Sequence, residues 1–219
     1  MGKKYDVLEA TEDAAKFGYS VGVFGAKLFY GVSGLSNLDN AMDSFVAERF
    51  RQRLDHFAYE HDNLSKKQKE DFYDDLKNNE QNVNYLYGFV EKTRTSTFDL
   101  HAKILAKLSV KLIKNKELNY FEDSLFANIN IFSEYDFKRF YEGMKENSHA
   151  DLVTEYFFKS EASPYIEQTL IQKYLNAGLI SHISDKVEHT GNDLGVTFYS
   201  NEFTYDFYDM LEEILEEDK

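Results

Sequence analysis

The residues of this chain whose types and spacing could do chemistry are Arg51 and His56, in the run Arg51-Gln-Arg-Leu-Asp-His56. Four residues separate them, on a segment whose apolar residues repeat with helical spacing. An arginine can stabilise negative charge, and a histidine can donate or accept a proton near neutral pH. The alternative interpretation is structural, with Arg51 and Arg53 paired to nearby carboxylates and His56 at the helix surface.

The Arg-x4-His spacing on a helix resembles the Arg-x4-6-His signature of the HEPN ribonuclease family, whose members are compact and all-helical. The resemblance implies that His56 would act as acid or base and that Arg51 would stabilise charge on the scissile phosphate, usually across a dimer. The chain differs from the family in having Gln52 directly after the arginine and in carrying the motif early. A HEPN-like ribonuclease using Arg51 and His56 is therefore one alternative function.

Other recognisable chemical motifs are missing from the sequence. It has no glycine-rich phosphate-binding loop, no HExxH zinc motif and no GxSxG nucleophile turn. It has one Glu-x-x-His pair, Glu146 and His149, whereas di-iron bundles need two such pairs and further carboxylates. The acidic clusters at 70–75 and 212–218 are typical of solvated helix faces. We therefore expect no cofactor and no metal site.

Composition limits the partners and the compartment. The 219 residues carry a formal net charge of −14 and no cysteine. That charge disfavours nucleic acid as a partner, because phosphate backbones are bound by clustered lysine and arginine. Without cysteine there is no disulfide or zinc thiolate, which favours a reducing cytoplasm. The protein as a whole is expected to be bacterial in style. Peripheral contact with the inner membrane is kept as an alternative.

The N-terminal segment from Phe17 to Leu35 is apolar and rich in glycine. Lys27 lies near its centre, and this charge disfavours a membrane-spanning helix. Small residues recur at helical spacing and form a ridge that another helix could approach closely. The candidate interaction residues of this small-residue ridge are Ala14, Gly18, Gly22, Gly25 and Ala26. The segment is interpreted as a buried packing helix, as a self-association surface or as a membrane-associating helix.

The rest of the chain predicts a mainly α-helical multi-helix bundle. Glycine is scarce after the N-terminal segment, and the single proline is Pro164. Apolar residues at helical intervals predict helices at 38–63, 65–78, 83–92, 97–114, 118–131 and 133–145. Capping boxes are expected at Ser65 and Ser133, and a further cap at Thr97. His101, on an apolar helix face, is expected to be a core or interface histidine.

The last quarter of the chain differs in character. Pro164 starts a helix that Gly178 ends, strands are predicted at Leu179–Val187 and Gly195–Tyr199, and a last helix follows at 201–217. This order is similar to the end of a winged-helix module, a helix followed by a two-stranded wing. The helix before the wing has no arginine, so the shape favours a structural or protein-contacting use over DNA reading.

These observations predict an N-terminal apolar segment (1–37), a central bundle (38–158) and a winged-helix-like α+β tail (159–219). The favoured function is non-enzymatic interaction or assembly, either self-association or binding of a protein partner, through the small-residue ridge and aromatic surfaces. The alternatives are the HEPN-like ribonuclease and a membrane-associated effector that inserts the glycine-rich helix. A winged-helix DNA-binding regulator is the least favoured of these alternatives.

Overall fold

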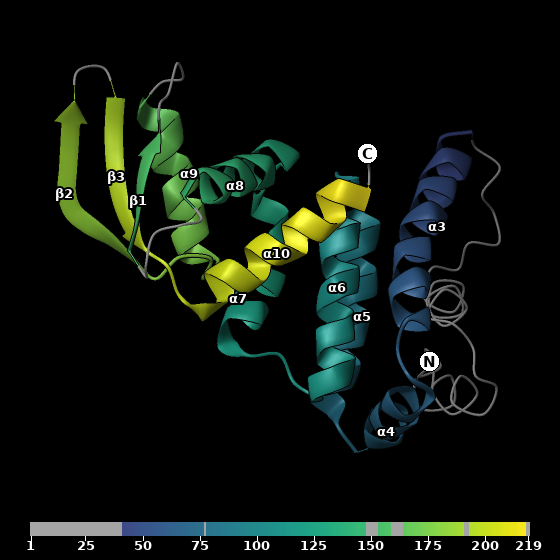
Figure 1. Ribbon diagram of the computed structural model, residues 1–219. Coiled ribbons are helices and arrows are strands. Elements are labelled where there is room, and N and C mark those ends of the chain that lie inside the picture. Colours follow the sequence, from purple (N-terminus) through teal and green to yellow (C-terminus); the bar gives the residue numbers. More distant parts are fainter. Residues whose placement is uncertain (1–40, 77, 148–152, 159–163, 191–192, 218–219) are drawn as a thin grey trace, which may run out of the picture. The chain divides into compact units, whose positions relative to one another are not determined.

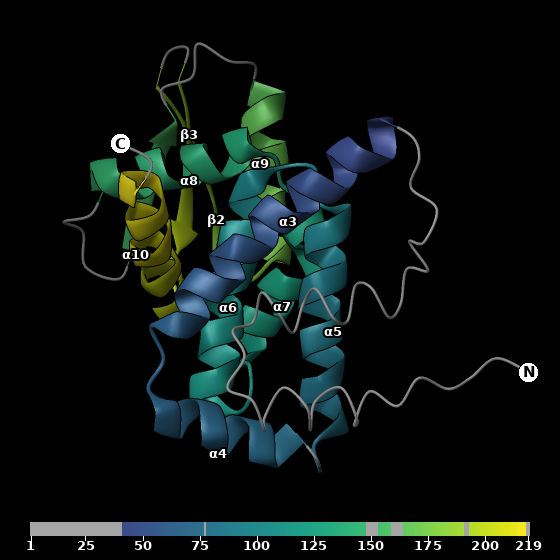
Figure 2. The same ribbon diagram turned by 90° about the vertical axis from the view of Figure 1, so that its right-hand side faces the viewer.

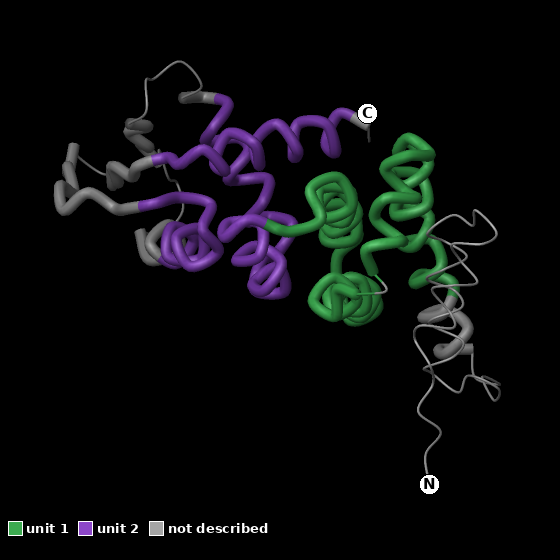
Figure 3. The backbone as a smooth tube through the Cα atoms, turned by 90° about the horizontal axis from the view of Figure 1, so that it is seen from below, with its two compact units in different colours: residues 1–118 green, residues 119–219 purple. Residues whose placement is uncertain are grey.

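The structure, a computed structural model, describes residues 41–76, 78–147, 153–158, 164–190 and 193–217. Helices dominate these residues, so the expected mainly α-helical class is confirmed. By its contacts the chain forms two compact units, 1–118 and 119–219 (Figure 3). The segments expected from composition, 1–37, 38–158 and 159–219, divide the chain at other places and stay a prediction.

Unit 1 is helical throughout its described residues. It contains α3 (Ala41–Asp62), α4 (Lys66–Leu76), α5 (Glu80–Thr95) and α6 (Asp99–Asn115) (Figure 1). Helices α5 and α6 form an antiparallel pair, α3 packs against α6, and α4 crosses the lower ends of α5 and α6 in Figure 2. Each of these helices falls within or close to a segment with predicted helical spacing.

Helix α6 lies at the centre of unit 1. Its apolar residues recur at three- and four-residue intervals, and this spacing directs them into the core. The buried apolar side chains of α6 include Leu100, Ile104, Leu105, Leu108, Leu112 and Ile113. Helix α3 supplies Phe50, Leu54 and Phe57 to the same core. His101 is also buried, with its ring edge-on to Phe98, so its core location is confirmed.

The predicted helix starts are correct at Ser65 and wrong at Thr97. The Ser65 N–H donates to Gln68 Oε1 at 3.0 Å, and the Gln68 N–H donates to Ser65 Oγ at 3.3 Å. Helix α6 instead begins after Phe98. The backbone of Phe98 is extended, and its side chain makes no capping hydrogen bond to the described residues. Thr97 lies one residue too early to cap it, and its carbonyl oxygen accepts a hydrogen bond from Arg49.

Unit 2 combines helices with a small sheet. Its helices are α7 (Tyr120–Asn128), the 3-10 turn η1 (Ile129–Ile131), α8 (Glu134–Asn147), α9 (Pro164–Asn176) and α10 (Glu202–Glu217). The capping box predicted before α8 is present. The Ser133 N–H donates to Asp136 Oδ2 at 2.8 Å, and the Asp136 N–H donates to Ser133 Oγ at 3.3 Å.

Helix α9 ends at Asn176, and Gly178 terminates it as the sequence predicts. The φ of Gly178 is +72°, a left-handed conformation that costs L side chains energy. The Gly178 N–H donates to the Leu175 carbonyl, and the Leu179 N–H donates to the Tyr174 carbonyl. A Cβ atom at position 178 would lie 3.1 Å from Cδ1 of Phe121, so the Phe121 ring would have to shift by a few tenths of an ångström to admit it.

The sheet is antiparallel, in the order β1-β3-β2. Its strands are β1 (Val153–Phe158), β2 (His182–Thr190) and β3 (Asp193–Tyr199) (Figure 1). Val153 of β1 pairs with Tyr199 of β3, and the register continues to Phe158 opposite Leu194.

Two details of the tail differ from the prediction. Strand β1 lies in sequence assigned to the helical bundle, and its partner β3 is about forty residues further along the chain. Leu179 and Ile180, predicted to open a strand, precede β2 and are buried in the turn after α9. Their apolar character serves the core around the end of α9, and β2 begins only at His182.

Aromatic rings fill the core of unit 2. The Phe132 and Phe137 rings stack with centroids 4.8 Å apart, and the Phe140 ring meets Tyr174 edge-on at 5.2 Å. Helix α10 closes this core from one side. Its predicted inward residues are all buried: Phe203, Phe207, Met210, Leu211 and Ile214.

Candidate functional site

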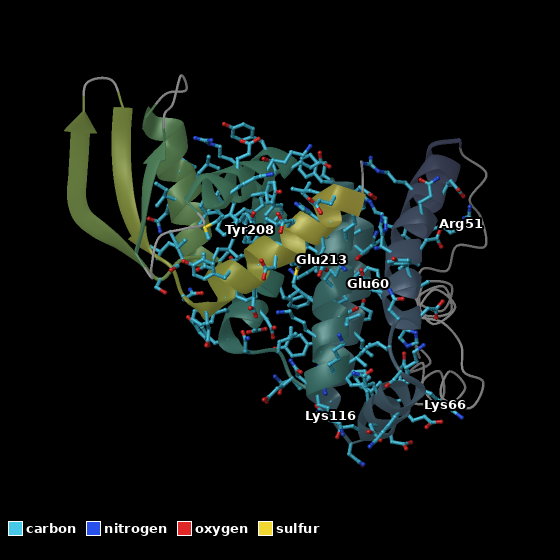
Figure 4. The ribbon with its side chains drawn as sticks, viewed as in Figure 1. Arg51, Glu60, Lys66, Lys116, Tyr208 and Glu213 are labelled. Carbon is cyan, nitrogen blue, oxygen red and sulfur yellow. The ribbon has the colours of Figure 1, made fainter. Side chains whose placement is uncertain are left out.

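The candidate catalytic residues Arg51 and His56 both lie on α3, but on different faces of it. Five residues turn an α-helix by about 140° beyond a full turn, so their side chains leave the helix in different directions. Arg51 is exposed, and Figure 4 shows it on the side of α3 that faces away from α6. His56 is half-buried toward the start of α6. A single chain therefore does not bring these two side chains together.

Arg51 forms a bidentate ion pair within its own helix. Its Nε donates to Glu48 Oε2 at 3.0 Å, and its Nη2 donates to Glu48 Oε1 at 2.7 Å. The hydrogen bond from Arg51 lowers the pKa of the Glu48 carboxyl, although burial works slightly against it. This is the carboxylate pairing that the structural interpretation of Arg51 expects. Exposed pairs of this kind stabilise a fold only slightly.

His56 pairs with the first residue of α6. Its Nε2 lies 3.1 Å from Asp99 Oδ2. The hydrogen bond with His56 is the main cause that lowers the pKa of Asp99, with smaller contributions from the charges of Lys103 and Arg53. His56 is therefore oriented by a carboxylate that also faces Arg53.

The buried arginine of α3 is Arg53, which sequence reasoning treated only as a surface ion-pair former. Its side chain is 3% exposed. Nη1 donates to the carbonyl oxygens of Ser96 at 2.5 Å and Thr93 at 3.4 Å, which lie at the C-terminal end of α5. Carbonyl groups at a helix end carry partial negative charge, so a guanidinium is well placed there. Nε lies 3.8 Å from Asp99 Oδ1.

These contacts belong to a polar stripe of α3, which we define as Arg49, Arg53, His56 and Glu60. Successive members are four, three and four residues apart, so all lie along one side of the helix. Arg49 Nη2 donates to the Thr97 carbonyl at 2.8 Å, and Glu60 Oε1 lies 2.8 Å from Lys107 Nζ. Glu60 is labelled between α3 and α6 in Figure 4. The stripe joins α3 to α6 and to the turn before it.

A sequence signal for Arg53 exists in its neighbours. Phe50 precedes it by three residues and Phe57 follows it by four, so Arg53 lies beside the apolar side of α3. Arg51 instead has Glu48 three residues before it and Asp55 four residues after it. Burial lowers the pKa of Arg53, and the nearby charge of Arg49 adds to this effect while Asp99 opposes it. An arginine nevertheless stays charged at neutral pH.

A second buried histidine, His61, lies at the C-terminal end of α3. Its Nε2 is 2.9 Å from the hydroxyl of Tyr73 on α4. Burial, with a contribution from the charge of Lys69, lowers the pKa of His61 to about 4, although Asp62 opposes this. Burial also raises the pKa of Tyr73. At neutral pH the imidazole is therefore uncharged, and its hydrogen bond with the Tyr73 hydroxyl joins α3 to α4.

Polar groups in unit 2 also serve packing. Asp136 is buried, and its Oδ2 lies 2.6 Å from Lys173 Nζ on α9, while its carbonyl accepts from the Tyr174 hydroxyl at 2.6 Å. On α10, burial and the charge of Glu212 raise the pKa of Tyr208 to about 12. The Tyr208 ring stacks on Tyr141 with centroids 5.3 Å apart. Tyr208 and Glu213 are labelled in Figure 4.

Several predicted residues lie outside the described part of the chain. The small-residue ridge (Ala14, Gly18, Gly22, Gly25 and Ala26) is among them, and so is His149. Glu146 lies in the last turn of α8, one residue beyond the helix predicted at 133–145. Within the described ranges, no three His, Asp or Glu side chains are grouped to hold a metal ion.

Comparison with protein-family models, curated proteins and solved structures finds no match to this chain. Among the helices that the structure describes, none is both long enough and apolar enough to cross a membrane.

Proposed function

We propose that the protein acts by recognition or assembly, self-associating or binding a protein partner through the small-residue ridge and exposed aromatic side chains. The observation that carries the proposal is a set of large, exposed apolar and aromatic side chains on both units. They are Tyr59, Tyr87, Tyr120, Ile131 and Tyr135, with Tyr120 the most exposed at 80%. Aromatic residues in such positions contribute much of the binding energy at protein interfaces.

The geometry of α3 favours this function over catalysis by Arg51 and His56. Each of the two side chains has its own carboxylate partner, Glu48 for Arg51 and Asp99 for His56. Catalysis on one phosphate would need both groups within hydrogen-bonding distance of the reacting atoms. Their placement on different faces of α3 supports a structural use of both within one chain.

The C-terminal tail is proposed to serve as a winged-helix-like module used for protein contact. The support is the order α9, β2, β3, α10, with a hairpin between two helices. The acidic residues of α10 and the net charge of −14 argue against a phosphate backbone as its partner.

The test is the oligomeric state of the full-length protein, measured by size-exclusion chromatography with light scattering over a range of concentrations. We expect a defined oligomer or a captured protein partner. Gly22→Leu should weaken self-association or partner capture, because a leucine would hold the approaching helix away from the ridge.

Tyr120→Ser with Tyr135→Ser should weaken association by removing aromatic contact area. Tyr120→Phe with Tyr135→Phe is the matched control, since it keeps the rings. A protein that stays monomeric at high concentration, with no effect of Gly22→Leu on stability or partner capture, would contradict the proposal.

A further inference from the structure

The guanidinium group of Arg53 uses only one of its three nitrogen atoms for hydrogen bonds to the described residues. Nη1 is used by the carbonyls of Thr93 and Ser96. Among the described residues, no oxygen lies within hydrogen-bonding distance and geometry of Nε or Nη2, although both atoms are buried. Nε and Nη2 together form the edge that binds two oxygens of a carboxylate or phosphate side by side. Burying charged donors without hydrogen-bond acceptors costs free energy, and an anion bound at this edge would offset that cost.

The open edge is directed at the N-terminal end of α6. The nearest anionic atom is Oδ1 of Asp99, the first residue of that helix, at 3.8 Å from Nε. This distance is an ion pair without a hydrogen bond. The N-cap residue, Phe98, provides no side-chain acceptor for the first amides of α6 among the described residues. The N-terminal end of a 17-residue helix carries partial positive charge.

Two guanidinium groups of α3 lie near this point. Arg49 and Arg53 are close enough for the charge of one to lower the pKa of the other, and Lys103 acts on Asp99. The Asp99 carboxylate faces both Arg53 and the imidazole of His56. Two neighbouring guanidinium groups would attract a small anion, while the acidic remainder of this chain, whose net charge is −14, repels large polyanions.

We propose that the Nε–Nη2 edge of Arg53, His56 and the first amides of α6 form a binding site for one phosphate group, free or carried by a small metabolite. The phosphate binds beside Nε and Nη2 of Arg53, where the Asp99 carboxylate now lies nearest, and the Asp99 side chain turns toward solvent. Its side chain is half exposed, so this movement is open to it. Two phosphate oxygens accept from Nε and Nη2, and a third lies toward His56 Nε2 and the helix amides. This site is independent of the assembly function proposed above.

The test is isothermal titration of the full-length protein with sodium phosphate against sodium chloride of equal ionic strength. Glycerol phosphate is titrated in parallel, to distinguish free phosphate from a phosphate monoester. We expect saturable binding of at least one of the two compounds. Arg53→Met should abolish it, and Arg51→Gln is the matched control, because it removes the same charge from the other side of α3.

Asp99→Asn keeps the proposal testable even if Arg53→Met does not fold. Removing the competing carboxylate should tighten phosphate binding at least threefold, whereas a purely structural Asp99 predicts no tightening. The proposal is overturned if neither compound binds to the wild-type protein. It is equally overturned if Arg51→Gln weakens binding as much as Arg53→Met, or if Asp99→Asn fails to tighten it.

Discussion

Acid should loosen the contact between α3 and α4 through His61. The pKa of this buried imidazole is about 4, against 6.5 for an unperturbed histidine. As the pH falls below 6.5, His61 becomes protonated in the unfolded chain but stays uncharged in the folded chain. The contribution of the uncharged His61 to the free energy of unfolding is therefore fully present above pH 6.5 and is lost as the pH falls toward 4. In the protonated imidazole, Nε2 can only donate to the Tyr73 hydroxyl.

The size of this effect follows from the two pKa values. At 1.36 kcal/mol for each pH unit, the full difference corresponds to about 3 kcal/mol of unfolding free energy. Between pH 7 and pH 5, about 2 kcal/mol of this should be lost. A loss of that size is a large fraction of the stability of an ordinary domain.

The assay is urea unfolding at pH 7, 6, 5 and 4.5, followed by circular dichroism, on the wild type and on His61→Gln. Glutamine keeps an acceptor within reach of the Tyr73 hydroxyl and does not titrate. The variant should be less stable at pH 7 through imperfect packing, and its stability should fall less steeply between pH 6.5 and 4.5. Carboxylates titrate equally in both proteins, so the difference isolates His61. Parallel pH profiles of the two proteins would refute the reasoning.

Three further predictions concern stability and are measured by urea unfolding at pH 7. Arg53→Ala should cost about 2–4 kcal/mol, because it removes the hydrogen bonds at the end of α5 and the weaker of the two contacts of Asp99; Arg51→Ala should cost under about 1 kcal/mol. Gly178→Ala should cost about 1–2 kcal/mol, because the left-handed backbone opposes a Cβ atom and the Phe121 ring must shift to admit it, and an unchanged midpoint would contradict this. Ser65→Ala should cost about 1 kcal/mol by removing the cap of α4, whereas Ser65→Asp, which keeps an acceptor, should be nearly neutral.

The elements that the sequence predicted well are those with local causes. The cap at Ser65 and the end of α9 at Gly178 depend on residues within five positions of each other, and both are present. The buried residues of α10 follow directly from their spacing. Local chemistry was therefore a sufficient guide for most helices and for several of their ends.

The predictions are wrong where residues far apart in the sequence determine the local structure. Strand β1, with Val, Thr, Tyr and Phe, has the composition of a strand, but its pairing with β3 spans about forty residues. Thr97 was assigned as a cap because of its residue type. Its carbonyl is instead bonded to Arg49, 48 positions away, and α6 starts after Phe98. Neither contact can be read from a local window.

The candidate catalytic pair shows why counting residues between two side chains does not define a site on a helix. The Arg-x4-6-His spacing allows four to six residues between the arginine and the histidine. Both Arg51, with four residues before His56, and Arg49, with six, satisfy it. Seven positions are close to two full turns, so Arg49 shares the face of His56, whereas Arg51 does not. Arg53, three positions before His56, shares that face too and meets the same carboxylate, Asp99. If an anion binds to α3, helix phase therefore places it beside Arg53 and His56 and leaves Arg51 as the bystander whose substitution changes nothing.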